Sequence, residues 1–354
     1  MEFLAEYGLF FAKAVTLVIA IVVVILIIVA ASQKNHRSEK GHIDVVKLND
    51  RYNAMHETIQ HAAIDEAEFK LNAKQEKKQQ KKEKADKKKE LKHKSPDAEL
   101  KHKKRVFVLN FHGDMKASAT DNLREEITTV LSLAKPEDEV VLCLESTGGM
   151  VHSYGLAASQ LSRIKSKNVP LTVCVDKVAA SGGYMMACVA DKIISAPFAV
   201  IGSIGVVAQL PNFNRLLKKI PVDYEMQTAG EYKRTLTIFG ENTDKAREKF
   251  SEELEDTHGL FKEFIRSNRP GLDVDKVATG ETWYGSKALE NNLIDEVKTS
   301  DEYLTSHHPE SDIFEVTYHV KKSIPEKFGF ASQAAMDRLL LTWWERLQST
   351  RFFS

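Results

Sequence analysis

The pattern of hydrophobic and polar residues divides the chain into parts with different textures. From residue 105 onward, apolar runs of strand length, such as 105–111, 139–145 and 171–175, alternate with stretches of helical spacing, such as 118–134. Nearly continuous apolar strands that alternate with helices are typical of a buried, largely parallel sheet. We therefore predict an α/β fold for a domain at 105–322.

The same pattern predicts the other elements of this domain. A helix is expected to begin at Ser181, and Ser118 or Thr120 is expected to cap the helix at 118–134. In chain order, the remaining elements are a helix from Gly149 to about residue 167, strands at 192–196 and 222–227, a long helix at about 243–268, a helix and turn over 282–297, and a last strand at 313–320.

Residues 8–31 form an almost uninterrupted apolar stretch. At about 1.5 Å per residue, a helix of this length crosses the ~30 Å hydrocarbon core of a bilayer. A cleaved signal peptide is the alternative, because Ala30 and Ala31 are small. The apolar stretch is too long for one, however, and Glu2 and Glu6 precede it. We therefore predict a single-pass transmembrane anchor, which makes the lipid bilayer a partner.

The charges beside this anchor bear on the side of the membrane. Lys34, Arg37 and Lys40 follow the apolar stretch, whereas only Lys13 and the amino terminus precede it. Because positive charge gathers on the cytoplasmic side of an anchor, this asymmetry favours a cytoplasmic domain, although the rule weakens for long domains.

Residues 32–104 are predicted to be a charged connector. Apolar side chains recur at helical spacing over 44–73, and 74–94 is almost entirely Lys, Glu and Gln. A segment without an apolar face buries too little surface to offset its ordering entropy, so a solvated helix or a disordered spacer is expected. Without interleaved aromatic residues for base stacking, we do not expect nucleic acid as a partner. The amphipathic tail at 323–354 is predicted to lie on a membrane surface or on a neighbouring subunit.

Composition narrows the chemistry only slightly. The 354 residues carry 50 Lys and Arg against 50 Asp and Glu, so no net charge attracts a polyanion. Cys143, Cys174 and Cys188 lie in apolar runs without metal-ligand spacing. This placement predicts buried free thiols and no disulfide framework.

Two successive strand-to-helix turns carry glycine pairs, Gly148-Gly149 and Gly182-Gly183, and Ser181 opens the second turn. Such turns gather at one edge of an α/β sheet, where ligands bind. Two backbone N–H groups beside a hydroxyl can hold a developing oxyanion, although tight packing alone explains a single glycine pair equally well. A third glycine cluster at 200–207 is apolar on both sides and is expected to be structural.

A serine hydroxyl needs a neighbouring base to become a nucleophile. His112, His152 and His258 have no obvious carboxylate to orient them, and the Gly-x-Ser-x-Gly elbow is absent because Ala179 replaces its first glycine. A lysine held neutral by burial is the remaining kind of base. Lys233 lies in a predicted loop before the long helix. From the residues alone, an ordinary surface lysine is the simpler interpretation.

Four motifs occur together and in order: Ser146-Thr-Gly-Gly149, Ala180-Ser-Gly-Gly-Tyr184, Gly202-Ser-Ile-Gly-Val206 and Glu231-Tyr-Lys233. With the apolar N-terminal stretch and the Lys-rich segment, they make the chain resemble the signal peptide peptidase A family of serine peptidases, S49. The resemblance covers essentially the whole chain and is strongest to the short, single-anchor members of the bacterial inner membrane.

The resemblance implies a Ser–Lys peptidase. Ser181 matches the nucleophile, Lys233 the general base, and the N–H groups of Gly149 and Gly182 the oxyanion hole. The resemblance also implies the spiral ββα fold of Clp protease subunits and crotonases, homo-oligomeric rings or bowls, and a periplasmic domain. It further implies peptide substrates such as signal peptides or other membrane-derived fragments, and no metal or cofactor.

Two positions depart from the family pattern. Thr147-Gly148 stands where many relatives have a proline, and Arg234 stands where an aspartate is frequent, which leaves open what supports Lys233. Two other classes remain as alternatives. A crotonase-like thioester enzyme would use the same N–H donors with Glu145 as the nearby carboxylate, and a membrane scaffold would be catalytically silent.

Overall fold

The computed structural model describes residues 41–65, 103–220, 222–308 and 310–320, and the isolated positions 13, 15, 16 and 78. A compact unit spans Ile43–Tyr318. Apart from positions 13, 15, 16 and 78, the predicted anchor, the Lys-rich part of the connector and the tail at 323–354 lie outside the described residues. No helix in the described ranges is both long and apolar enough to cross a bilayer.

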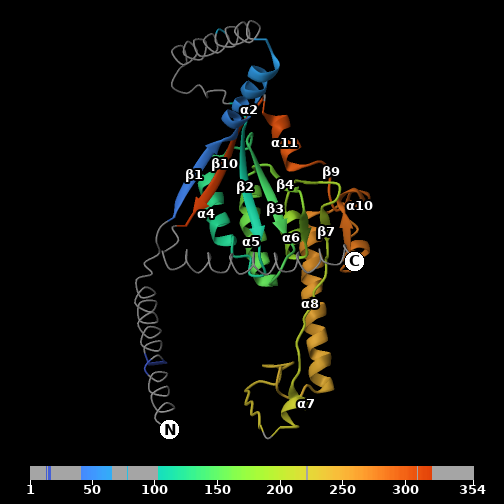
Figure 1. Cartoon of the computed structure of the whole chain (residues 1–354). Helices are drawn as coiled ribbons and strands as arrows, with labels where there is room; N and C mark the ends of the chain where they lie inside the picture. The colour runs from blue at the N-terminus through green and yellow to red at the C-terminus, as the bar shows by residue number, and fades with distance from the viewer. Residues whose placement is uncertain are drawn as a thin grey trace, which may run out of the picture. The chain divides into compact units, whose positions relative to one another are not determined.

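Ten strands within these ranges form one sheet (Figure 1). The main path of the sheet runs through β1 (His42–Lys47), β10 (Asp312–His319), β2 (Arg105–Gly113), β3 (Glu139–Ser146), β4 (Leu171–Val175), β6 (Lys192–Ser195) and β9 (Glu296–Val297). A branch joins β5 (Val178–Ala180), β7 (Val200–Gly202) and β8 (Thr282–Tyr284) to the end of β3. Along the main path, each strand from β10 to β9 pairs in parallel with the next one. In the branch, β5 pairs in parallel with β3 and with β7, whereas β7 and β8 are antiparallel. The predicted α/β fold with a largely parallel sheet is confirmed.

The two faces of the sheet are covered by different helices. In β2, Leu109 and Phe111 belong to the larger core, whereas Val106 and Val108 belong to a smaller cluster, because successive strand residues point to opposite faces. The larger core includes residues of α4 (Thr120–Leu131), α5 (Val151–Lys165) and α6 (Gly182–Ala187). The smaller cluster includes residues of α2 (Leu48–Ala63) and α11 (Ser300–His307).

Several local predictions are corrected. The range 222–227 forms no strand, and the short helix α7 (Asn214–Leu217) precedes it. Neither Ser118 nor Thr120 caps α4, because Ala119 occupies the N-cap position without a side-chain bond. The Thr120 hydroxyl instead donates to the carbonyl of residue 117 at 2.7 Å. β1 and α2 lie inside the range predicted as connector, and from Ile43 onward they belong to the compact unit.

The longest helix of the described ranges, α8 (Asp244–Asn268), agrees with the predicted one. Its buried residues, Phe261 and Ile265, lie near its C-terminal end. Figure 1 shows the N-terminal half of α8 running away from the sheet toward α7. We call residues 207–220 and 222–243, which lead from β7 to α8, the tip segment.

Candidate active site

Ser181 lies between β5 and α6 in a strained backbone conformation, with φ 52° and ψ −118°. Its N–H donates to the carbonyl of Gly202 at 2.8 Å, and its carbonyl accepts from the N–H of Met185 at 2.9 Å. A positive φ at a residue with a side chain costs roughly 1–3 kcal/mol and persists only where the surroundings enforce it. Serine nucleophiles on strained strand-to-helix turns are a recurring arrangement.

The Gly148-Gly149 turn contacts the Ser181 turn. A methyl group built on Gly148 would come within 2.6 Å of the Gly182 nitrogen and 2.8 Å of Ser181 Cβ. Gly148 also has a φ of +86°, which favours glycine. The predicted meeting of the two glycine turns at one edge of the sheet is therefore observed, with Ser181 between them.

Two backbone N–H groups of the glycine turns have no hydrogen-bond partner among the described residues. Within the described part of the chain, the N–H groups of Gly149 and Gly182 make no hydrogen bond. Gly182 is the first residue of α6, where a helix leaves its N–H groups unpaired. The N–H of Gly148, by contrast, donates to Ser146 Oγ at 3.1 Å. Paired donors of this kind can stabilise a developing oxyanion.

A small pocket opens at this junction. It is lined by Gly149, Val151, Ser181, Gly182, Met185, Gly205, Val206, Thr257 and Phe261. The cluster at 200–207 was expected to be purely structural, and Gly202 fits that role because a methyl group there would meet the Trp283 ring at 2.8 Å. Gly205 and Val206 nevertheless line the pocket. Thr257 and Phe261, which belong to α8, had no signal in the sequence.

Lys233 does not lie at this pocket within one chain. Its side chain is exposed and makes no hydrogen bond or ion pair with the described residues. The neighbouring Tyr232 ring lies 5.9 Å from Lys245 Nζ and 5.5 Å from Lys249 Nζ, near the start of α8. The Ser181 pocket is lined by α8 residues about twelve positions further on, which corresponds to about 18 Å along the helix at ~1.5 Å per residue.

The histidines that were considered as bases do not line the pocket. His152 is exposed on α5. His258 lies on α8 with a buried Nε2 that has no partner among the described residues. His112 has a 76% exposed side chain, and its Nδ1 lies 3.7 Å from a Glu145 carboxylate oxygen.

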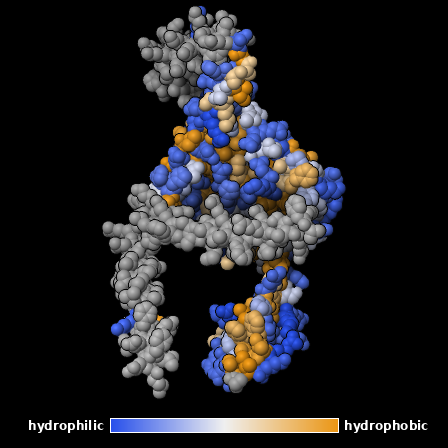
Figure 2. Space-filling model, in the orientation of Figure 1, coloured by the Kyte–Doolittle hydropathy of each residue, from blue (hydrophilic) through white to orange (hydrophobic). Residues whose placement is uncertain are grey.

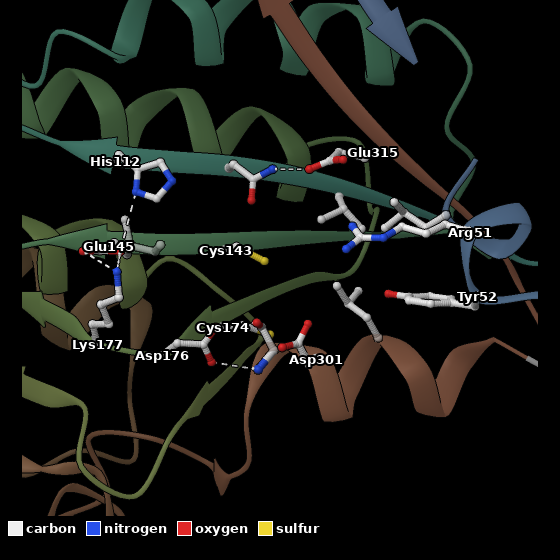
Figure 3. Close-up of a pocket in the computed structure, with 16 residues that line it drawn as sticks. Arg51, Tyr52, His112, Cys143, Glu145, Cys174, Asp176, Lys177, Asp301 and Glu315 are labelled. Atoms are coloured by element: carbon white, nitrogen blue, oxygen red, sulfur yellow. Dashed lines mark hydrogen bonds and ion pairs between the residues drawn. The ribbon is translucent and has the colours of Figure 1, made fainter. Parts of the chain in front are cut away.

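Glu145, the carboxylate considered for a crotonase-like site, faces a separate groove of about 250 Å³ on the side of the sheet that carries α2 and α11 (Figure 3). There it accepts a 2.9 Å hydrogen bond from Lys177 Nζ. Cys143 and Cys174 also line this groove as free thiols, and burial raises the pKa of Cys143 to about 12. None of the residues matched to the nucleophile, the base or the oxyanion hole lines it.

The comparisons with known proteins agree along the chain. Residues 2–161 match the family model described as Peptidase family S49 N-terminal, and residues 163–313 match Peptidase family S49. The Probable protease SohB of Haemophilus influenzae is 52% identical over 93% of this chain and 92% of its own length. The protein of the same name from Buchnera aphidicola subsp. Schlechtendalia chinensis is 51% identical over 86% of this chain and 100% of its own.

Among solved structures, the 1510-N membrane-bound stomatin-specific protease with a bound substrate peptide is 15% identical, with a TM-score of 0.40. That match covers 64% of this chain and 96% of the other. The family matches and the close relatives favour a peptidase over the crotonase-like enzyme and the silent scaffold. The chain therefore belongs to peptidase family S49 and is a serine protease.

Proposed function

We propose that this serine protease is an endopeptidase with a Ser–Lys dyad, in which Ser181 is the nucleophile and Lys233 the general base. The observation that carries the proposal is that Ser181 lines one pocket together with Gly149 and Gly182, whose N–H groups make no hydrogen bond with the described residues. Lys233 rests on the family motif at 231–233.

In the proposed mechanism, neutral Lys233 takes the proton of the Ser181 hydroxyl while Oγ bonds to the scissile carbonyl carbon. The two glycine N–H groups hold the negative charge on the carbonyl oxygen, a contribution for which one donor is typically worth ~10²–10³ in rate. Protonated Lys233 returns its proton to the leaving amine as the C–N bond breaks. Water, deprotonated by the same lysine, then releases the acyl group from Ser181.

We propose that the lysine acting on each Ser181 comes from a second copy of the chain. Tyr232, the neighbour of Lys233, contacts Lys245 and Lys249, which lie about 18 Å along α8 from the pocket residues Thr257 and Phe261. The tip segment that carries Lys233 exposes many large apolar side chains, including Val207, Leu216 and Phe239 (Figure 2). An apolar surface of this kind favours assembly. Burial between two copies would also favour the neutral amine that a base requires.

The pocket and the sequence together suggest the substrates. Val151, Met185, Val206 and Phe261 make the pocket wall mainly apolar, and its volume is only about 10 Å³. We therefore propose cleavage after small apolar residues in unfolded peptides, with signal peptides and other membrane-derived fragments as the substrate class. Residues 8–31 would anchor the enzyme in the inner membrane, close to such fragments. The branch of β5, β7 and β8 off the main sheet is compatible with the spiral ββα fold.

Mixing two inactive variants tests both the dyad and its origin. We expect Ser181→Ala and Lys233→Ala each to lower peptidase activity of the full chain by at least ~10³-fold, because each removes a reacting group. When the two variants are co-expressed, Ser181 of one copy meets Lys233 of another, and activity should return to a fraction of the wild-type value.

Three outcomes would contradict these proposals. Near-normal turnover by the Lys233→Ala variant would show that Lys233 is not the general base. Peptidase activity of the Ser181→Ala variant would show that Ser181 is not the nucleophile. Inactive mixtures that still form oligomers of wild-type size would show that the lysine does not come from a second copy.

A further inference from the structure

Ser146 and Tyr154 form a buried polar cluster behind the two glycine turns. These two residues are 2% and 0% exposed. The Ser146 and Tyr154 hydroxyl oxygens lie 2.6 Å apart, and the Tyr154 hydroxyl donates to the carbonyl of Asp114 at 2.8 Å. The Gly148 N–H donates to Ser146 Oγ at 3.1 Å. Neither side chain lines the Ser181 pocket, so neither touches the substrate there.

The hydrogen positions in this cluster follow from its donors and acceptors. The Asp114 carbonyl can only accept, so the single Tyr154 hydroxyl proton is used there. Ser146 must therefore donate its own proton to the Tyr154 oxygen, which leaves a Ser146 lone pair to accept from Gly148. The bonds run in one direction, from Gly148 through Ser146 and Tyr154 to Asp114. Chains of this kind strengthen one another in a buried site.

The two ends of Tyr154 support the two oxyanion donors. Through Ser146, its hydroxyl fixes the peptide plane that ends at Gly148, which is the plane before the one that carries the Gly149 N–H. Its ring lies against Gly182, where a methyl group would come within 2.7 Å of Tyr154 Cδ2 and 2.8 Å of Tyr154 Cβ. One rigid side chain therefore contacts the Gly182 turn directly and the Gly148 turn through Ser146.

We propose that Ser146 and Tyr154 are positioning residues that set the spacing and direction of the Gly149 and Gly182 N–H groups. The inference rests on the oxyanion hole of the proposed function. It adds the two residues that keep the donors of that hole in position. Catalytic donors act only when they are held in place before the reaction, and a displacement of about 1 Å can cost ~10²-fold in rate.

The hydroxyl of Tyr154 can be removed without changing the ring. We expect Tyr154→Phe, in the full chain, to lower kcat about 10- to 100-fold on a fluorogenic peptide with alanine before the cleaved bond. KM should change less than about threefold, because the pocket wall is intact. Binding of a peptide aldehyde, whose adduct with Ser181 places an oxyanion in the hole, should weaken in parallel with kcat/KM. Ser146→Ala, which leaves the Gly148 N–H without its acceptor, should show the same pattern.

Tyr184→Phe is the matched control. Tyr184 is also fully buried, and its hydroxyl donates to a backbone carbonyl, that of Leu293, at 2.9 Å. Its removal should therefore cost a similar amount of thermal stability, but that carbonyl belongs to neither glycine turn. We expect Tyr184→Phe to keep kcat and aldehyde affinity within about threefold of wild type.

The results separate this inference from the proposed function. A folded Tyr154→Phe or Ser146→Ala variant with wild-type kcat and aldehyde affinity would overturn the positioning role, even if Ser181→Ala were inactive. Equal losses of kcat in Tyr154→Phe and Tyr184→Phe would indicate a general packing effect and would also overturn it. If Ser181→Ala remained active, the proposed function itself would fail.

Discussion

At the scale of single residues, the site depends on positive φ angles, which residues with a side chain rarely adopt. Ser181 has a φ of 52°, and Gly148 has a φ of +86°. The glycine could be anticipated from the sequence, because glycine tolerates such angles. The positive φ of Ser181 could not be anticipated in this way. Serine as a residue type does not indicate that the surrounding turns hold its backbone outside the commonly populated φ/ψ regions.

This strain makes a prediction about stability. Both Ser181→Ala and Ser181→Gly remove the hydroxyl, but only glycine relieves the positive φ, which costs roughly 1–3 kcal/mol. Glycine also loses more conformational entropy on folding than alanine, which offsets part of this gain. The net expectation is that Ser181→Gly is more stable than Ser181→Ala by about 1 kcal/mol in denaturant unfolding. Ser159, an exposed residue inside α5, is the control. There the order should reverse, since glycine destabilises a helix relative to alanine. A Ser181→Gly variant less stable than Ser181→Ala would refute the strain.

At the scale of elements, α8 connects two parts of the proposed machinery. Thr257 and Phe261 line the Ser181 pocket, while Lys245, in the first turn of the same helix, pairs with Glu231 at 2.5 Å. Glu231 is two residues from Lys233. The start of α8 therefore supports the loop that carries the proposed base.

Removing the N-cap of α8 tests this support. Thr243 Oγ1 accepts from the Ala246 N–H at 3.2 Å, and loss of such a cap costs about 1 kcal/mol. We expect Thr243→Ala to speed hydrogen exchange in the first turn of α8 and to lower kcat/KM severalfold. Thr299→Ala removes an equivalent cap from α11, where Thr299 Oγ1 accepts from the Glu302 N–H at 3.2 Å, and should leave peptidase activity unchanged. Equal activity losses in both variants would contradict a specific role for the α8 cap.

At the scale of the whole unit, one buried carboxylate joins distant segments. At the start of β3, Glu139 accepts hydrogen bonds from Lys104 at 2.6 Å, Thr172 at 2.8 Å and Tyr303 at 2.6 Å, and His307 lies 3.5 Å away. Burial alone would raise the pKa of Glu139, but these bonds outweigh it and hold the pKa far below its ordinary value. The bond to Glu139 is the main reason that the pKa of His307 is raised.

The two shifts predict opposite pH dependences. Because the pKa of His307 is raised on folding, its contribution is complete below pH ~6.5 and disappears as pH rises through the folded pKa. Because the pKa of Glu139 is lowered, its contribution is complete above pH ~4.3 and disappears as pH falls. We expect His307→Gln to reduce the free energy of unfolding by about 1 kcal/mol at pH 5.5 and by less at pH 8.5. His112→Gln, at an exposed histidine, is the control and should change stability little at either pH. A loss in His307→Gln that grows with pH would refute the assignment.

The sequence by itself determined the class of fold and pointed to the two glycine turns. Apolar runs of strand length and the long helix at about 243–268 are local patterns, so the α/β sheet and α8 could be predicted. The glycine pairs and Ser181 are also local signals, because glycine marks turns and close approach. Where the chain lacks such periodicity, as at 222–227, the predicted strand is wrong.

Only the tertiary structure decided which of these signals meet. It brought the turn at Gly148 into contact with the turn at Ser181. It also placed Phe261, which lies about eighty residues later in the chain, in the wall of the Ser181 pocket. It also left Lys233 outside the residues that line the Ser181 pocket, although the motif order gives no sign of that. The physical reason is that hydrophobic periodicity records which face of an element is buried, but not the partner against which it packs. Tyr154 is the clearest case, since in the sequence it is one more residue of a helix, whereas in the fold its ring lies against Gly182 and its hydroxyl lies 2.6 Å from that of Ser146, two residues before Gly148.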